Sequence, residues 1–146
     1  MPLLAVLALA TAVSAGPAAS CDGNTREMEA CLGGRLAKHE ATLATYVAAA
    51  RKRVQQAADA APSGYSSVEK AIGGFDAAEV AWSKYREAAC GAVYDYWSQG
   101  AIRGLNFLQC RILFTQRHAH TIWELWLTYP DGTPPILPEP PPATFP

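Results

Sequence analysis

Apolar residues recur along most of the chain at the three- and four-residue spacing of amphipathic helices. The first predicted helix runs from Thr25 to about Ala58. Gly33-Gly34 interrupts its pattern and weakens it by roughly 1 kcal/mol per glycine relative to alanine. Its apolar positions are Met28, Leu32, Leu36, Leu43, Tyr46, Val47, Ala50 and Val54.

Two further helices are predicted after the break at 61–64. The second is expected to begin at Asp76, because Asp76 and Glu79 have the spacing of a capping box. The third runs from about Leu105 to Leu127. Four residues share one face of the second helix: Ala78, Trp82, Tyr85 and Ala89. The two aromatic residues of this face, Trp82 and Tyr85, are predicted to fill the core.

The fold class predicted by these patterns is all-α. Helices joined by short connections pack as antiparallel neighbours, so residues 21–129 are expected to form a small antiparallel three-helix bundle. The last stretch, residues 130–146, is rich in proline and has no periodic apolar positions. We expect it to be a disordered, polyproline-like tail that folding does not require.

The N-terminal segment 1–20 resembles a signal peptide, with an apolar run of suitable length followed by small residues. Cleavage is expected after Ala15 or Ser20. The segment lacks the usual Lys or Arg before the apolar run, and the competing interpretation is a buried N-terminal helix. The run is too short to span a bilayer, and no later segment is predicted to be a membrane anchor.

All four cysteines, Cys21, Cys31, Cys90 and Cys110, follow the predicted cleavage site. An even number in a small exported domain favours two disulfides, and an up-down-up bundle brings all four to one end. Three pairings are possible, of which we prefer Cys31–Cys90 with Cys21–Cys110. A lipid anchor on Cys21 is disfavoured because it leaves an odd number of cysteines. A zinc site is disfavoured because the cysteines are too widely spaced along the chain.

Charge and motif content argue against several classes of function. Lys and Arg number 12, Asp and Glu 13, and the net charge is −1, so no basic excess indicates nucleic acid. His118 and His120 point about 200° apart on a helix and do not share a metal easily. With no nucleophile or phosphate-loop motif, we expect a protein that is not an enzyme and that needs no metal or cofactor.

The stretch 82–90, WSKYREAAC, resembles the W-x-x-[YF]-R-[DE]-x-x-C signature of the LprI-like family of lysozyme inhibitors. TREMEAC at 25–31 is similar to the family's entry motif, with Glu29 where Asn is usual. Glu40 and Leu43 match part of its first-helix motif. Cys110, Thr115 and Arg117 resemble its ending, one residue short. The likeness spans roughly 21–120.

This resemblance implies a small, exported, disulfide-linked helical protein, periplasmic or secreted, that binds and inhibits lysozyme. The alternative is a structural or envelope-associated interaction module that never contacts lysozyme. Within the signature, Trp82, Tyr85 and Arg86 are expected to be structural, and Arg86 and Glu87 to form surface ion pairs.

The candidate contact residues lie between Cys90 and Cys110. Tyr and Trp dominate binding hot spots, and this segment carries several aromatic residues beside one carboxylate. A segment held at both ends by cysteines also loses less entropy on binding. The residues that we expect to contact a partner are Tyr94, Asp95, Tyr96, Trp97 and Arg103.

Overall fold

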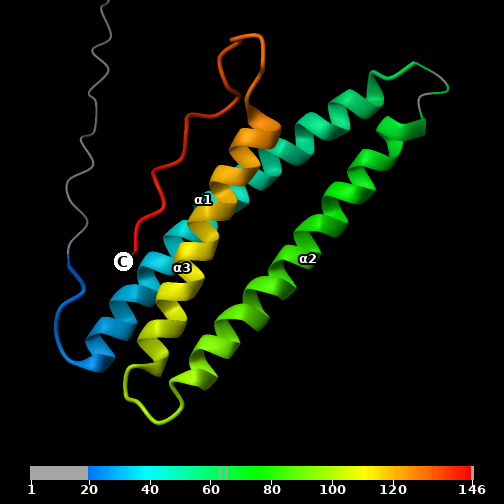
Figure 1. The fold of residues 1–146 in the computed structure, drawn as a ribbon. Coiled ribbons are helices and arrows are strands. Elements are labelled where there is room, and N and C mark those ends of the chain that lie inside the picture. The colour runs from blue at the N-terminus through cyan, green and yellow to red at the C-terminus, as the bar shows by residue number, and fades with distance from the viewer. Residues whose placement is uncertain (1–19, 63, 65, 146) are drawn as a thin grey trace, which may run out of the picture.

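A computed structural model describes residues 20–62, 64 and 66–145 of the chain, and within them every long element is a helix. The helices are α1 (Thr25–Asp59), α2 (Ser66–Tyr96) and α3 (Arg103–Ile122), and α3 continues into a short π-helix, η1 (Trp123–Leu127). They run up, down and up, with the α1–α2 and α2–α3 connections at opposite ends (Figure 1). The predicted all-α three-helix bundle is confirmed.

The start of α1 follows from its sequence. The side chain of Asn24 accepts a hydrogen bond from the Glu27 backbone N–H at 3.1 Å, and the Glu27 carboxylate accepts one from the Asn24 N–H at 2.9 Å. This reciprocal capping box satisfies two donors that the first turn leaves without a helical partner. α1 therefore begins at Thr25, as predicted.

α2 begins ten residues before the predicted start at Asp76, which lies inside the helix. The carboxylate of Asp76 instead accepts two hydrogen bonds from Arg51 of α1, at 2.8 and 2.9 Å. These bonds lower the pKa of Asp76. The spacing that resembled a capping box therefore reflects an ion pair between helices, and it gave a wrong helix boundary.

The core has two parts along the bundle axis. Near the α2–α3 connection, the cluster is small and comes from α1 and α3: Leu32, Leu36, Leu105 and Ile112. Toward the other end it is larger and includes one residue of α2: Leu43, Tyr46, Ala50, Val54, Phe75, Ala119, Ile122 and Leu127. The apolar positions that define the predicted first helix supply most of the α1 contribution.

The prediction that Trp82 and Tyr85 both fill the core is half wrong. Trp82 is half-buried and packs against the larger cluster. Tyr85 is 61% exposed, and its ring only meets Phe114 of α3, with centroids 5.6 Å apart. At about 100° per residue, the buried face of α2 passes through Trp82 and Arg86, and Tyr85 lies about 100° away from Arg86.

The disulfides are Cys21–Cys31 and Cys90–Cys110, and the preferred pairing was therefore wrong. All four cysteines do lie toward one end, as expected. Cys21 precedes α1 and is not part of its helix, so residues 20–24 can fold back and bring Cys21 within 5.7 Å (Cα–Cα) of Cys31. The second bond joins α2 to α3 across their connection.

The C-terminal segment, expected from the sequence to be a disordered tail, makes defined contacts with the bundle. That folding does not require it stays a prediction. After η1 the chain turns and runs back along the bundle toward the start of α1 (Figure 1). Leu137 packs against the larger core cluster, and Pro140 is buried. A proline-rich segment cannot join a helix, but its carbonyl groups still accept hydrogen bonds from side chains, and here they do.

The end of η1 is tied to α1 by one arginine. The Arg53 guanidinium donates to the backbone carbonyls of Trp126 and Thr128, and it lies 4.1 Å from the centroid of the Tyr129 ring. A cation suits the negative end of a helix dipole. The predicted signal peptide, residues 1–20 with cleavage after Ala15 or Ser20, lies outside the described residues except for Ser20.

Candidate functional site

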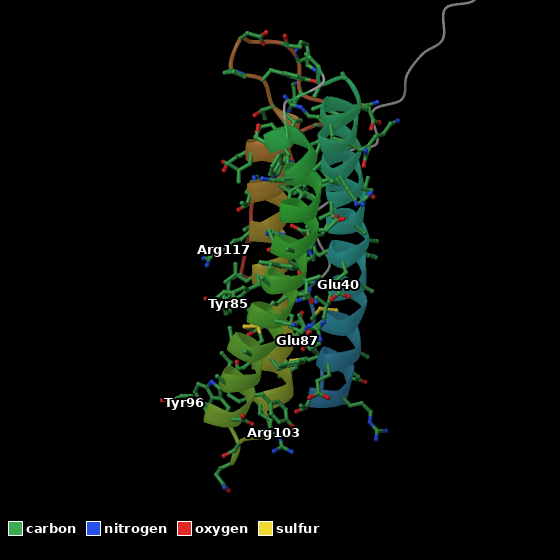
Figure 2. The ribbon with its side chains drawn as sticks, turned by 90° about the vertical axis from the view of Figure 1, so that its right-hand side faces the viewer. Glu40, Tyr85, Glu87, Tyr96, Arg103 and Arg117 are labelled. Carbon is green, nitrogen blue, oxygen red and sulfur yellow. A yellow bond between two sulfur atoms is a disulfide. The ribbon has the colours of Figure 1, made fainter. Side chains whose placement is uncertain are left out.

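The five predicted contact residues come together at the end of the bundle where α2 passes into α3. We call Tyr94, Asp95, Tyr96, Trp97 and Arg103 the apex. The first three lie in the last turn of α2, Trp97 begins the connection, and Arg103 is the first residue of α3. Figure 2 shows Tyr96 and Arg103 at this end of the molecule.

The connection between the helices is ordered by its own backbone. Gly100 N–H donates to the Trp97 carbonyl at 2.8 Å, and Arg103 N–H donates to the Gly100 carbonyl at 3.3 Å. The Arg103 guanidinium carbon lies 4.7 Å from the centroid of the Tyr94 ring, and the Tyr94 ring meets Phe107 edge-on at 6.0 Å. These contacts fix the apex before any partner arrives.

Two aromatic side chains of the apex are available to a partner. Tyr96 is 81% exposed and Trp97 is 42% exposed, and their rings meet at 89° with centroids 5.4 Å apart. Asp95 is exposed as well, whereas Tyr94 is half-buried under Arg103. The apex therefore presents an aromatic pair and a carboxylate on a narrow, convex end of the bundle.

An apolar hollow of about 290 Å³ adjoins the apex between α2 and α3. Trp97 forms part of its wall, together with the Cys110 half of the disulfide and Phe145 from the C-terminal segment. Phe145 is 70% exposed, so the end of the tail lies at the surface beside the apex. Sequence patterns gave no sign of this, because residue 145 reaches the hollow only when the tail folds back.

The signature residues lie deeper and form a charged network that joins the three helices. The Arg86 Nη1 donates to Glu40 of α1 at 3.1 Å and to the Thr115 hydroxyl of α3 at 2.9 Å. Arg111 of α3 lies 3.1 Å from both Glu40 and Glu87. Arg86 is only 8% exposed, so the predicted surface ion pair is wrong. Glu40 and Glu87 face each other between α1 and α2 (Figure 2).

Trp82 links the same network to α3. Its ring stacks on His118 with centroids 3.9 Å apart and planes 9° apart, and the Arg86 guanidinium carbon lies 4.9 Å from the centroid of the Trp82 ring. His118 Nε2 in turn lies 3.0 Å from the Glu79 carboxylate. His118 is thus enclosed by its partners, with only 11% of its side chain exposed.

Part of the family motifs therefore forms contacts between the helices. Five motif residues come from all three helices, and the structure brings them to one level: Glu40, Trp82, Arg86, Glu87 and Thr115. Sequence analysis missed this grouping, although the motif positions on all three predicted helices were a usable signal. Because these residues bind one another, we look for a surface that contacts a partner protein among the exposed residues. The apex is the group with two exposed aromatic side chains in contact, Tyr96 and Trp97.

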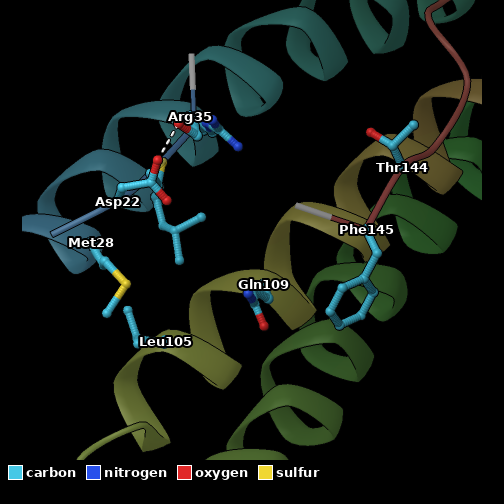
Figure 3. A pocket seen from close by; sticks show the side chains of 10 residues that line it. Asp22, Met28, Arg35, Leu105, Gln109, Thr144 and Phe145 are labelled. Atoms are coloured by element: carbon cyan, nitrogen blue, oxygen red, sulfur yellow. Dashed lines mark hydrogen bonds between the residues drawn. The ribbon is translucent and has the colours of Figure 1, made fainter. Parts of the chain in front are cut away.

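A second hollow, of about 450 Å³, lies on the other side of the disulfide end (Figure 3). Met28 and Asp22 line it from the N-terminal side, Leu105 and Gln109 from α3, and Phe145 from the tail. Among the residues that the structure describes, no three or more His, Cys, Asp or Glu side chains are grouped so as to hold a metal ion.

Fold and site together define a class of protein: a disulfide-stapled helical domain whose signature polar residues hold the bundle together and whose aromatic apex faces solvent. The family model of the lysozyme inhibitor LprI matches residues 17–121, so the chain belongs to this family. It is a family of inhibitors rather than of catalysts. No curated protein and no solved structure matched the chain.

Family membership and covalent structure also bear on where the protein works. Both Cys21–Cys31 and Cys90–Cys110 are formed, and disulfides persist in oxidising compartments. Together with the family, they indicate a protein located outside the cytoplasm. Within the described part of the chain, no helix is long and apolar enough to cross a membrane.

Proposed function

We propose that this protein is exported to the periplasm or the medium and there binds and inhibits a lysozyme through its apex. The observation that carries the proposal is the contrast between Arg86 of the family signature, which is buried among its partners, and the apex, which is exposed. Within the signature, Arg86 contacts Trp82, Glu87 and, on α1, Glu40. Tyr96 and Trp97 remain exposed at the end of the bundle.

The shape of the apex suits a cleft. Lysozymes hydrolyse their substrate with two carboxylates placed on either side of the scissile bond, so an inhibitor has to occupy the space between them. The apex is convex and narrow, and Arg103 supplies a cation at its base. Asp95 supplies a carboxylate for the cationic rim that we expect around such a cleft.

The rigidity of the apex favours binding. The Cys90–Cys110 disulfide joins α2 to α3 behind it, and the Arg103 guanidinium covers the Tyr94 ring. Side chains that are already ordered lose less entropy when a complex forms. Tyr, Trp and Arg are also the residues that most often dominate the energy of protein interfaces.

The test is a lysozyme assay with a paired substitution. The variant Asp95→Asn, Trp97→Ala should keep the far-UV circular dichroism and melting temperature of the parent, because both side chains lie outside the core. Its affinity for lysozyme, measured by calorimetry, should fall at least tenfold, about 1.4 kcal/mol. Inhibition, measured as slower clearing of a cell-wall suspension, should weaken in parallel.

Leu125→Ala is the matched control, since Leu125 is 69% exposed but lies in η1, far along the bundle from the apex. It should inhibit like the parent. If the oxidised parent at high micromolar concentration leaves lysozyme fully active, the proposed inhibition is wrong. If the paired variant inhibits as well as the parent, inhibition stands and the apex is not its site.

A further inference from the structure

The C-terminal segment is docked along one edge with a repeat of three residues. Leu137 and Ala143 are half-buried and Pro140 is buried, whereas the residues between them are exposed. Three residues per turn is the repeat of a polyproline II helix. The burial pattern of the segment therefore matches that of an extended strand with this repeat, with one of its three edges turned toward the bundle.

A backbone hydrogen bond from the Ile136 N–H to the Leu127 carbonyl, at 2.9 Å, holds the start of the segment. Beyond it, side-chain donors of the bundle are aimed at carbonyl oxygens of the segment. The Trp123 indole N–H donates to the Leu137 carbonyl at 2.9 Å, and the Tyr46 hydroxyl donates to the Pro138 carbonyl at 2.7 Å. His120 Nε2 lies 2.9 Å from the Pro141 carbonyl, one three-residue turn further on. Proline has no N–H, so only such donors can bind its backbone.

Gln116 adds a contact that fixes the direction of the segment. Its Oε1 accepts from the Thr144 N–H at 3.1 Å, and its amide nitrogen lies 3.2 Å from His39 Nε2. We call Tyr46, Gln116, His120 and Trp123 the tail groove. Aromatic side chains that pack and donate along an extended proline-rich strand are a recurring mode of peptide recognition.

The tail groove belongs to the bundle and is not made by the tail. Tyr46 is 7% exposed and part of the larger core cluster, and burial raises the pKa of its phenol. Trp123 packs against the same cluster. Both polar atoms find their hydrogen-bond partners in the C-terminal segment, and buried Tyr and Trp groups require such a partner. The groove is thus suited to an acceptor-rich, donor-poor strand.

We propose that the tail groove is a binding site for an extended, proline-rich segment of another protein, and that residues 136–145 occupy it as a tethered competitor. The tether is residues 130–135, with Gly132 at φ +83° in its turn. A flexible tether of this length gives an effective concentration in the millimolar range. A partner that binds the tail groove with the same affinity as the tail therefore displaces half of the tail at millimolar concentration. A partner that binds more tightly displaces it at a proportionately lower concentration.

The experiment uses the full chain labelled with ¹⁵N and an unlabelled synthetic peptide with the sequence of residues 133–146. As peptide is added, the amide signals of Ile136, Leu137 and Thr144 should move to positions typical of disordered chains. Signals of α1 and α3 away from the groove should stay in place. Half of the tail should be displaced at roughly millimolar peptide.

One protein variant and two altered peptides distinguish specific recognition by the tail groove from a nonspecific effect of added peptide. The variant Leu137→Ala weakens only the tethered strand, so the unaltered peptide should displace its tail at about a tenfold lower concentration. A peptide carrying the same substitution should fail to displace the tail of the unaltered protein. A peptide with one alanine inserted between its counterparts of Pro138 and Pro141 loses the three-residue repeat and should also fail.

The proposal is overturned if the tail signals of both the parent and the Leu137→Ala protein stay unchanged at several millimolar peptide. It is also overturned if the tail signals shift with protein concentration alone and the mass doubles, because the occupant is then a second copy of this chain. Neither arm contains lysozyme, so the outcome is independent of the proposed inhibition.

Discussion

Arg86 is the residue whose removal tests the internal network most directly. We consider Arg86→Met, which keeps a long apolar side chain and deletes the guanidinium. The substitution removes the hydrogen bonds to Glu40 at 3.1 Å and to Thr115 at 2.9 Å, and with them the cation that lies over the Trp82 ring. Arg111 remains 3.1 Å from Glu40, so that carboxylate keeps one cation.

The magnitude follows from these interactions. Hydrogen bonds that involve a charged group contribute about 1.5–3 kcal/mol each, and a cation over an aromatic ring about 0.5–1 kcal/mol. Two terms reduce the loss: the buried Nε of Arg86 has no hydrogen-bond partner in the structure, and the Glu40 side chain is 39% exposed. We expect a net loss of about 2–4 kcal/mol, close to or below the value for breaking a fully buried pair.

The assay is urea unfolding followed by circular dichroism, with the disulfides intact. Glu40→Gln and the double variant complete a cycle, and we expect a coupling energy of at least about 1 kcal/mol between Arg86 and Glu40. Arg117→Ala is the control, because Arg117 is exposed on α3 (Figure 2), and it should change stability by less than about 0.5 kcal/mol. A free energy of unfolding for Arg86→Met within about 0.5 kcal/mol of the parent, on the order of a surface substitution, refutes the reasoning.

Two further predictions concern the disulfides and pH. Non-reducing peptide mapping of the exported protein should recover Cys21 linked to Cys31 and Cys90 linked to Cys110, and a Cys31–Cys90 peptide contradicts this fold. Burial, and next a neighbouring arginine, lower the pKa of His39 from its ordinary value of 6.5. The unfolded chain therefore binds more protons just below pH 6.5, so stability should fall as the pH is lowered through 6.5 to the depressed pKa. In the variant His39→Gln, the free energy of unfolding should depend less on pH in this range. An unchanged slope in the variant argues against a role for His39.

Much of the fold could be predicted because helix periodicity is a local property. The apolar repeat from Met28 to Val54 and the cap at the start of α1 fix that helix without reference to the rest of the chain. The start of α2 could not be found this way, since Asp76 serves Arg51 across the bundle rather than its own backbone. The face of α2 was also misassigned, because Arg86 is buried by its partners and not by hydrophobicity.

The candidate site was predictable in composition more than in structure. The aromatic run before the α2–α3 connection is visible in the sequence, and helix ends place it at the apex. The position of the tail was not predictable, because its contacts join Pro138 to Tyr46 and Thr144 to Gln116, far apart along the chain. The disulfide pairing failed for a related reason: the fold-back of residues 20–24 has no periodic signal.

The Cys90–Cys110 disulfide has a consequence for how the protein withstands proteolysis. It turns the apex and both adjoining helix ends into a closed covalent ring, so a single cut in this exposed connection releases no fragment. A protease that cleaves after Arg103 leaves α2 and α3 attached through the two sulfur atoms. Separation of the fragments then requires reduction as well as cleavage, and in an oxidising compartment a nicked molecule keeps its two halves together.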